Sequence, residues 1–391
     1  MAAYIIAGCR TPIGKFLGGL ASLPATQLGA ACVAEALRRS QVEPAEADEI
    51  IFGQILTAGV GQAPARQAAL GGGLPPTVAA VTINKMCGSG LKAVMLADQA
   101  IRAGDARCII AGGMENMSRA PHLLTGTREG WKYGPQTALD SMIHDGLWCP
   151  IEQAAMGSAA DYIASSRSVS RKDQDAFAVE SHRRAVAAVA EGRFNEEIVP
   201  LVVPGRKVDA RVDRDEGPRP ETTIESLAKL KPAFDSSGTV TAGNASQLSD
   251  GAAAVVVVDE QRAQRSKSPL KARIVASATS GVEPKEIFIA PVTAIQRVLA
   301  KADLTLDDID LVELNEAFAA QCLACARPLA LDPAKTNVNG GAIALGHPIG
   351  ASGARVLVTL LYALAARGLR RGLASLCLGG GNAVAMIVER V

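Results

Sequence analysis

Four residues of this chain have the chemical types and positions that covalent catalysis needs. Cys87 and Cys377 are thiols, His347 is one of only four histidines, and Asn315 supplies an amide. Each lies at the expected end of a strand or near the expected start of a helix, beside glycines or other small residues. Two thiols, an imidazole and an amide fit acyl transfer, in which one thiol takes the acyl group and the other moves protons.

Cys87 follows an expected strand at 78–84 and precedes an expected helix at 91–102, with Gly88 and Gly90 beside it. The dipole and unpaired N–H groups of a helix start lower the pKa of a nearby thiol. The same N–H groups can hold an oxyanion that forms on an acyl carbon attached to the sulfur. A small buried thiol at a turn is the alternative interpretation.

His347 lies in the glycine-rich stretch 338–355, which leads into an apolar segment at 356–361. This pattern predicts a loop that opens a helix, with the imidazole placed to act as a base or to orient an oxyanion. Cys377 ends an expected strand and precedes three glycines at 379–381, which let backbone approach a substrate closely. A strand cysteine is otherwise usually a core residue.

Asn315 follows an expected strand at 309–314 and precedes an expected helix at 316–326. Parallel sheets present ligands beyond the carboxyl ends of their strands, although the alternative role of Asn315 is a helix N-cap. Cys322 and Cys325 have the spacing of a redox or zinc pair, but no second pair or histidine lies near them in the sequence. We therefore expect buried thiols there and no metal site.

The composition is that of an ordinary globular protein, with 391 residues, 48% hydrophobic residues and a net charge of +1. Near-neutral charge and 3% aromatic residues argue against nucleic-acid binding. No run is long and apolar enough to span a membrane, and the N-terminus lacks the charged start of a signal peptide. We expect a cytoplasmic enzyme whose eight cysteines are free thiols.

Alternating strand and helix patterns at both ends of the chain predict an α/β architecture with buried sheets. Segment 87–94 aligns with segment 350–357, since both carry Ser-Gly-x-basic at an expected helix start. This similarity predicts two duplicated halves whose matching helices lie in the interior, although two glycine-rich loops can also agree by chance. Long loops, a polar helix and charged stretches between 117 and 243 predict an insertion.

Six stretches, in order along the chain, carry a more specific signal: they lie at 84–93, 111–118, 241–246, 315–320, 339–353 and 377–381. With these stretches the chain resembles the thiolase family throughout its length. The resemblance implies an α/β thiolase fold, with two duplicated βαβαβαββ halves in a five-layered αβαβα arrangement plus an inserted loop domain. The N-terminal half is expected at 1–117 and 250–270, the loop domain at 118–249 and the C-terminal half at 271–391.

The resemblance also implies an acetyl-CoA C-acetyltransferase activity, a reversible Claisen condensation of two acetyl-CoA to acetoacetyl-CoA and CoA. In that reaction His347 helps to deprotonate Cys87, which carries the acyl group. Cys377 removes a proton from the α-carbon of the second acetyl-CoA, or activates the thiol of CoA in thiolysis. His347 and a water held by Asn315 stabilise the enolate, and the backbone N–H groups of Cys87 and Gly379 hold the oxyanion.

By the same resemblance, CoA thioesters are substrates and no cofactor is permanently bound. Arg219 is expected near the adenine or a phosphate of CoA, and apolar side chains form a tunnel for the pantetheine arm. The expected CoA contacts are Leu147, Met156, Arg219, Ser226, Leu227, Ala233, Phe234, Ala242, Ser246, Leu248, Ala317 and Phe318. Segment 126–141 matches the loop by which relatives pair dimers into a homotetramer.

Two departures from the family pattern leave the acyl-chain preference open. Ala154 and Ala155 stand where many short-chain members carry bulky residues, and segment 286–291 reads Glu-Ile-Phe-Ile-Ala-Pro where relatives carry Met-Gly-x-Gly-Pro. The alternatives are therefore a 3-ketoacyl-CoA thiolase for longer or functionalised chains, within fatty acid metabolism, and an inactive CoA-ester-binding subunit. The presence of Cys377 argues against the alternative that the chain is a related decarboxylating ketoacyl synthase.

Overall fold

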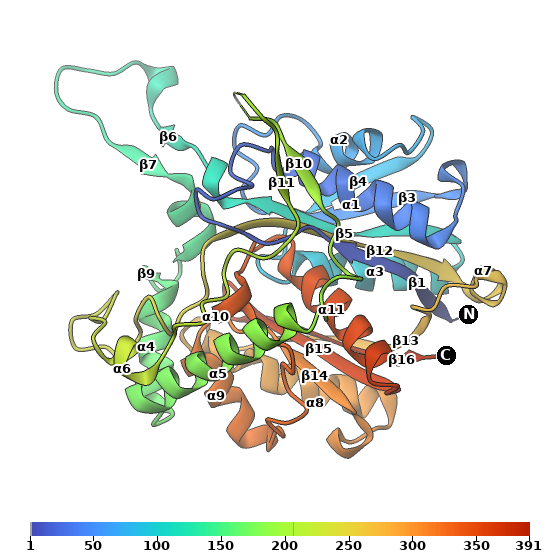
Figure 1. Cartoon of the computed structure of the whole chain (residues 1–391). Helices are drawn as coiled ribbons and strands as arrows, with labels where there is room; N and C mark the ends of the chain where they lie inside the picture. Colours follow the sequence, from blue (N-terminus) through green and yellow to red (C-terminus); the bar gives the residue numbers. More distant parts are fainter. Residues whose placement is uncertain (1, 206) are drawn as a thin grey trace.

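A ten-stranded mixed sheet runs through the whole molecule in the computed structural model, which describes residues 2–205 and 207–391 (Figure 1). Residue 1 of the predicted N-terminal half lies outside the described residues. The strand order is β4-β3-β5-β12-β1-β13-β16-β15-β14, with β2 beside β12. The strands are β1 Ala3–Arg10, β2 Gly14–Lys15, β3 Glu49–Gly53, β4 Ala79–Ile83, β5 Cys108–Asn116, β12 Ser249–Asp259, β13 Ala272–Gly281, β14 Leu311–Leu314, β15 Arg371–Leu378 and β16 Asn382–Arg390.

The two ends of this sheet have the same topology. In the first, β3 is parallel to β4 and β5, and β5, β12 and β1 follow in antiparallel order. In the second, β14 is parallel to β15, and β15, β16 and β13 follow in antiparallel order. The counterpart of β4 is reduced to one parallel bridge between Val312 and Thr336. Two βαβαβαββ units therefore meet where β1 pairs with β13.

Helices form three layers that alternate with the two ends of the sheet. They are α1 Ala25–Ser40, α2 Pro64–Gly71, α3 Ser89–Ala103, α8 Ala290–Ala302, α9 Ala319–Leu329 and α11 Ser352–Ala366. One core cluster joins α3 and α11 to both ends of the sheet, a second joins α1 and α2 to the first end, and a third joins α8 and α9 to the other. Alternate residues of β12, such as Val255 and Val256, enter different clusters, as strands buried on both faces require.

The repeated Ser-Gly-x-basic segments explain how the two central helices cross. A Cβ added to Gly90 of α3 would lie 2.6 Å from the backbone nitrogen of Ala354 in α11. A Cβ added to Gly353 of α11 would lie 2.3 Å from the backbone nitrogen of Leu91 in α3. Backbone therefore touches backbone at the first turn of each helix, which brings the loops before Ser89 and Ser352 together.

A long insertion separates β5 from β12. It contains the helices α4 Met156–Ser166, α5 Arg171–Ala190 and α6 Ile224–Ala228, a π-helical turn at Met142–Leu147, and the strand pairs β6 His122–Leu124 with β7 Ala138–Asp140, β8 Trp148–Cys149 with β9 Ala154–Ala155, and β10 Leu201–Val203 with β11 Ala210–Val212. The β6–β7 hairpin projects away from the body of the molecule (Figure 1). Among the described residues, no helix is long and apolar enough to cross a membrane.

The segment at 316–318 differs from the sequence-based expectation, because α9 begins at Ala319 and not at Glu316. Backbone hydrogen bonds join Ser246 N–H to the Ala317 carbonyl at 3.0 Å and Ala319 N–H to the Asn244 carbonyl at 2.9 Å. These contacts with the insertion keep the segment extended, and the helix is capped at Phe318. Asn315 is therefore not the helix N-cap. In α9, Cys322 and Cys325 are buried free thiols, as predicted.

Candidate active site

Cys87 lies in a tight turn between β4 and α3. Met86, just before it, has a left-handed backbone with φ of 47°, a conformation that costs a non-glycine residue about 1–3 kcal/mol. The Asn84 side chain accepts a hydrogen bond from Met86 N–H at 3.0 Å. The Ser89 hydroxyl accepts from Lys85 N–H at 2.8 Å and donates to the Met86 carbonyl at 2.7 Å. The turn is therefore held in a strained shape that presents the thiol.

Burial raises the pKa of the Cys87 thiol to about 12, with a smaller contribution from the Glu115 carboxylate. The backbone N–H groups of Cys87 and Gly379 act the other way, because they donate toward the sulfur and favour the thiolate. The net shift is therefore opposite to the one expected from a helix start, because burial outweighs the backbone N–H groups. A neutral thiol of this kind needs a base to take its proton.

His347 has the properties of that base. The Ser352 hydroxyl has one hydrogen, and we assign it to the bond with the Pro348 carbonyl at 2.9 Å. The hydroxyl oxygen then accepts from Nδ1–H of His347 at 2.6 Å, which leaves Nε2 with a lone pair. Burial, and then the Arg355 charge, lower the pKa of His347 to about 3. The imidazole is thus neutral, and Nε2 is buried without a partner among the described residues.

Cys377 and Asn315 lie on neighbouring parallel strands. Asn315 directly follows β14, and its N–H donates to the Ser375 carbonyl of β15 at 3.0 Å, two residues before Cys377. Burial raises the pKa of the Cys377 thiol well above its usual range, and Cys87 nearby adds to the effect. The amide oxygen and nitrogen of Asn315 are buried without partners among the described residues. Such an amide is suited to hold an ordered water.

The two segments that carry the thiols pack directly against each other. A Cβ added to Gly88 would lie 2.3 Å from the Leu378 side chain, and a Cβ added to Gly379 would lie 3.1 Å from the Met86 side chain. Gly88 therefore has to be a glycine for the Cys87 turn to approach the end of β15. This contact also brings the Gly379 N–H close enough to the Cys87 sulfur to favour its thiolate.

A cavity of about 650 Å³ opens onto these groups, and its lining includes Cys87, His347, Cys377 and Gly379. Two apolar clusters form its walls. One contains Cys377 with Ile287, Phe288 and Phe318, and the other packs Cys87 against side chains that include Met142 and Ile349. The described lining holds two cations, Lys15 and Arg219, and no carboxylate. The cavity therefore has a neutral reactive floor, formed by Cys87, His347 and Cys377, and a cationic mouth, formed by the exposed Lys15 and Arg219.

Three aromatic rings follow one another along the cavity wall. The Phe288 and Phe318 ring centroids lie 5.2 Å apart and the Phe234 and Phe318 centroids 6.4 Å apart, both in edge-to-face geometry. A Cβ added to Gly157 would lie 2.0 Å from the Phe234 ring, so that ring packs on bare backbone of α4. Three of the seven phenylalanines of the chain therefore shape this one wall.

Comparison with known proteins gives the same family for both parts of the chain. The model described as "Thiolase, N-terminal domain" matches residues 3–261, and the model described as "Thiolase, C-terminal domain" matches residues 268–390. The chain belongs to the thiolase family. The resemblance predicted from the six stretches is therefore confirmed.

Thiolases of known sequence and structure match the chain over its full length. An acetyl-CoA acetyltransferase of Cupriavidus necator is 53% identical, over 99% of this chain and 98% of its own length. One of Pseudomonas aeruginosa is 52% identical with the same coverage. The crystal structure of the Bacillus anthracis acetyl-CoA acetyltransferase superposes with a TM-score of 0.97 at 41% identity, over 100% of this chain and 99% of that one. The predicted thiolase fold is thus confirmed.

Most of the residues that resemblance to thiolases suggested for CoA line the cavity. They are Leu147, Met156, Arg219, Ala233, Phe234, Ala242, Ser246, Leu248, Ala317 and Phe318. Ser226 and Leu227 are outside the lining. The Ser226 hydroxyl caps α6 by accepting from Thr223 N–H at 3.0 Å, and Leu227 is buried against Ala319 and Ile343. Asn315 also lies outside the lining.

Sequence reasoning missed other cavity residues, including Lys15, Phe16, Met142, Ile143, Gln247 and Ile349. Lys15 and Phe16 belong to a segment some seventy residues before Cys87, which is positioned by long-range contacts such as the pairing of β2 with β12. No local sequence pattern indicates that such a residue lines the cavity. The departures at Ala155, Ile287 and Phe288, in contrast, were visible in the sequence, and all three side chains line the cavity.

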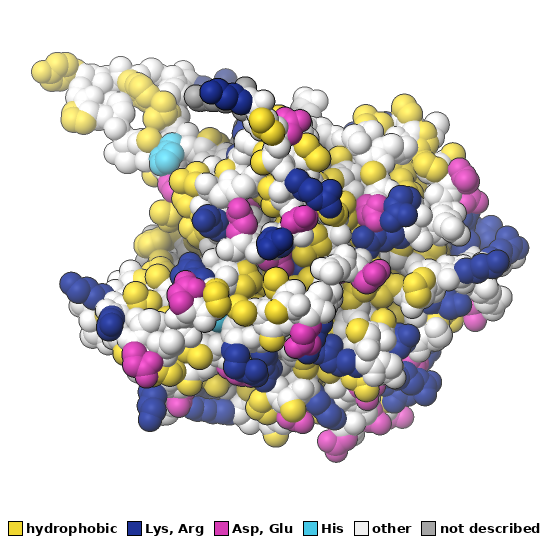
Figure 2. All heavy atoms as spheres, in the orientation of Figure 1, with side chains coloured by type: hydrophobic (Ala, Val, Ile, Leu, Met, Phe, Trp, Pro, Cys, Tyr) yellow, Lys and Arg dark blue, Asp and Glu magenta, His cyan; other side chains and the backbone are white. Residues whose placement is uncertain are grey.

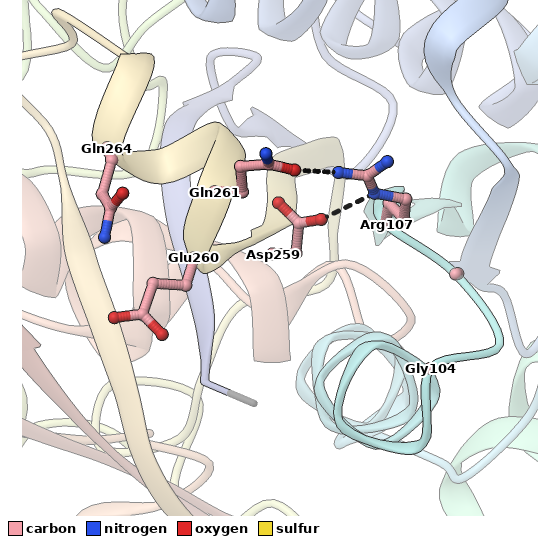
Figure 3. Close-up of a pocket in the computed structure, with 7 residues that line it drawn as sticks. Gly104, Arg107, Asp259, Glu260, Gln261 and Gln264 are labelled. Atoms are coloured by element: carbon pink, nitrogen blue, oxygen red, sulfur yellow. Dashed lines mark hydrogen bonds and ion pairs between the residues drawn. The ribbon is translucent and has the colours of Figure 1, made fainter.

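A second depression lies elsewhere, between the end of α3 and α7 Glu260–Arg265 (Figure 3). Its labelled side chains include Arg107, which donates to Asp259 at 2.8 Å and also bonds Gln261. It contains no thiol and no histidine among the described residues. Arg107 and Asp259 are paired with each other, and the depression lacks the reactive groups that line the cavity above Cys87.

Proposed function

We propose that this thiolase is an acetyl-CoA C-acetyltransferase, which condenses two acetyl-CoA to acetoacetyl-CoA and CoA and catalyses the reverse thiolysis. The observation that carries the proposal is the meeting of two thiols and an unpartnered neutral imidazole nitrogen on one cavity. Relatives at 52% and 53% identity carry the name of this activity. We also propose that the enzyme acts in fatty acid metabolism and is located in the cytoplasm.

The first step is the acylation of Cys87. Nε2 of His347 takes the proton of the Cys87 thiol, and the sulfur attacks the thioester carbonyl. The bond from the acyl carbon to the CoA sulfur breaks, and the Cys377 thiol gives its proton to that sulfur, so that CoA leaves as the thiol. Cys377 is then a thiolate and His347 is an imidazolium. The N–H groups of Cys87 and Gly379 hold the oxyanion of the tetrahedral intermediate. Donors of this kind contribute about 2.7–4 kcal/mol each to the barrier reduction. The support is that both N–H groups act to lower the pKa of the Cys87 thiol, as donors close to its sulfur do.

The second step is the condensation. The Cys377 thiolate takes a proton from the α-carbon of a second acetyl-CoA, and the enolate attacks the acyl group on Cys87. The bond from the acyl carbon to the Cys87 sulfur breaks, and this sulfur takes back the proton from His347 once the new C–C bond has formed. Protonated Nε2 of His347 and a water held by Asn315 stabilise the enolate oxygen. The unpartnered amide of Asn315 supports that role. In thiolysis Cys377 instead takes the proton of the CoA thiol.

The CoA arm is proposed to lie along the cavity, with its nucleotide at the cationic mouth. Arg219 is exposed there and forms no ion pair among the described residues. Apolar side chains such as Leu147, Met156 and Phe234 line the path of the pantetheine. Ser226 and Leu227, which lie outside the lining, are proposed to contact the ligand only through its exposed end.

We propose the organisation predicted from the sequence, with halves at 1–117 with 250–270 and at 271–391 around a loop domain at 118–249. We also propose a homotetramer built as a dimer of dimers. Strand β4 is an edge strand whose Ala79 and Val81 are exposed, and an exposed apolar edge favours pairing with another chain. The projecting hairpin within 126–141 exposes Tyr133 and Trp131, which suits the second contact (Figure 1).

A second candidate is a 3-ketoacyl-CoA thiolase for longer or functionalised chains. The small side chain of Ala155 on the cavity wall favours it, because it leaves room that a bulky residue would fill. Phe288 weighs against it, since its ring is only 3% exposed and closes the wall beside Cys377. We therefore favour short chains.

Thiolysis rates against 3-ketoacyl-CoA chain length, with Cys377→Ala as the control, test the proposal. Acetoacetyl-CoA should be the best substrate, and the control should be inactive. A longer or branched substrate that gives the highest kcat/KM would instead establish the second candidate. No turnover with any chain length would leave an inactive CoA-ester-binding subunit.

A further inference from the structure

Lys15 is the cavity cation that neither the family resemblance nor the sequence pattern assigned to any role. We propose that its ammonium group binds a phosphate of the CoA nucleotide, together with Arg219, and that it thereby selects full CoA thioesters over thioesters that lack the nucleotide. The proposal rests on the proposed function, because it names how that same cavity recognises the charged end of its substrate.

The loop that carries Lys15 forms one rim of the cavity. Lys15 pairs with Ser249 across β2 and β12, and Phe16 N–H donates to the Leu248 carbonyl at 3.0 Å. Leu248 and Ser246 line the same cavity as Lys15 and Phe16. Main-chain pairing therefore fixes the cation beside the segment proposed to hold the CoA arm.

Side chains from distant segments also hold this rim. Leu17 has a left-handed backbone with φ of 57°, which is rare for a branched residue. Its N–H donates to the Ser118 hydroxyl at 2.8 Å, and that hydroxyl donates to the Asp250 carboxylate at 2.6 Å. Leu17 itself is 68% exposed, so the strain is not offset by burial of its side chain. This turn is strained, is held by hydrogen bonds from distant segments and is exposed at the cavity mouth. Such a turn is suited to contact a ligand.

The nearby carboxylate serves the backbone and leaves the ammonium group available. Glu216 accepts hydrogen bonds from Lys15 N–H at 3.0 Å and from Gly19 N–H at 3.1 Å. No ion pair involves the Lys15 ammonium or the Arg219 guanidinium in the described part of the chain, and the described cavity lining holds no carboxylate. Both cations of the cavity are therefore available to an anionic ligand.

The charge of the lining indicates which part of the ligand they meet. An acyl group, its thioester and the pantetheine arm are neutral, and the rest of the lining is largely apolar. Two cations without a carboxylate at such a mouth match the phosphates of a nucleotide. The Phe16 side chain, 39% exposed beside Lys15, adds an apolar face that suits a purine ring.

The test compares Lys15→Ala, Lys15→Arg and the control Lys267→Ala, with acetoacetyl-CoA and with acetoacetyl-pantetheine, which lacks the nucleotide. Lys267 is an exposed lysine beyond α7 and outside the cavity, so its removal changes the net charge equally. Figure 2 shows Lys and Arg side chains gathered over α7, at the right-hand edge of the molecule as drawn in Figure 1.

Lys15→Ala should raise KM for acetoacetyl-CoA by about 5-fold with kcat unchanged, the size expected for one exposed charge pair. Lys15→Arg should restore KM, Lys267→Ala should leave it unchanged, and no variant should change kcat/KM for acetoacetyl-pantetheine. An unchanged KM in Lys15→Ala, or an equal loss with both substrates, would overturn the inference. If the wild-type protein turns over neither substrate, the proposed function itself fails, which is a separate result.

Discussion

The floor and the mouth of the cavity are built in different ways. At the floor, the sulfur of Cys377 and the imidazole of His347 are buried at the ends of core elements, and burial keeps both groups neutral. At the mouth, Lys15 and Arg219 are exposed, charged and carried by a loop and by the insertion. Bond making and substrate capture are therefore carried out by separate parts of the fold. Changes at the floor should act on kcat, and changes at the mouth on KM.

The largest effect should come from Cys87→Ala. Removal of the sulfur leaves no atom to carry the acyl group, so we expect kcat for thiolysis of acetoacetyl-CoA to fall by at least about 10⁴-fold. Cys87→Ser, with a side chain of nearly the same size, should fold normally and be similarly inactive. Residual activity above about one hundredth of wild type would place the nucleophile elsewhere, on the scale of known nucleophile deletions.

His347→Ala should reduce kcat by about 10²–10⁴-fold, the usual contribution of a general base. With His347 in place the pKa of the Cys87 thiol is about 12. In His347→Ala the reaction must go through the free thiolate, whose fraction should rise about tenfold per pH unit from pH 7 to 10, whereas in the wild type Nε2 can take the proton as the sulfur attacks. The rate of alkylation of Cys87 by iodoacetamide measures this fraction. In the wild type the rate should depend less steeply on pH. Equal slopes for both proteins would contradict the role of His347.

Phe288→Ala should change which substrate is preferred rather than the chemistry. Loss of the ring opens the wall beside Cys377, so kcat/KM for 3-ketohexanoyl-CoA relative to acetoacetyl-CoA should rise by roughly 10- to 100-fold. Phe288→Leu, which keeps most of the volume, should give an intermediate ratio. An unchanged ratio in both variants would show that another residue limits chain length.

The smallest effect should come from Ser118→Ala, at the mouth. Leu17 N–H loses its acceptor, and the strained rim should relax without any change at the floor. KM for acetoacetyl-CoA should rise about 2- to 3-fold, the effect of one hydrogen bond worth about 0.5 kcal/mol, while kcat stays the same. A fall in kcat would show that rim and floor are coupled.

The sequence predicted the floor well because its residues lie in local patterns. Cys87, His347 and Cys377 each lie in a glycine-rich turn next to an apolar strand or helix, and the repeated Ser-Gly-x-basic segments indicated that the helices after two of these turns lie in the interior. The structure explains their meeting by the contact of Gly90 with the backbone of Ala354. Such signals are short-range, so they can be interpreted without a structure.

The sequence could not predict the mouth or the protonation states. Lys15 reaches the cavity through strand pairing across more than two hundred residues, and Phe318 ends an extended segment because residues 244–246 pair with it. Burial, which comes from the whole fold, reverses the expected direction of the pKa shift at Cys87. Neither long-range strand pairing nor burial can be recognised from a local sequence pattern.

The central claim is that Cys87 carries the acyl group while Cys377 moves the protons. The most direct measurement is the intact mass and peptide map of Cys377→Ala after incubation with acetyl-CoA and acid quenching. We expect one acetyl group, located on Cys87, which accumulates because condensation is blocked. An unmodified protein, or an acetyl group on any other residue, would contradict the account.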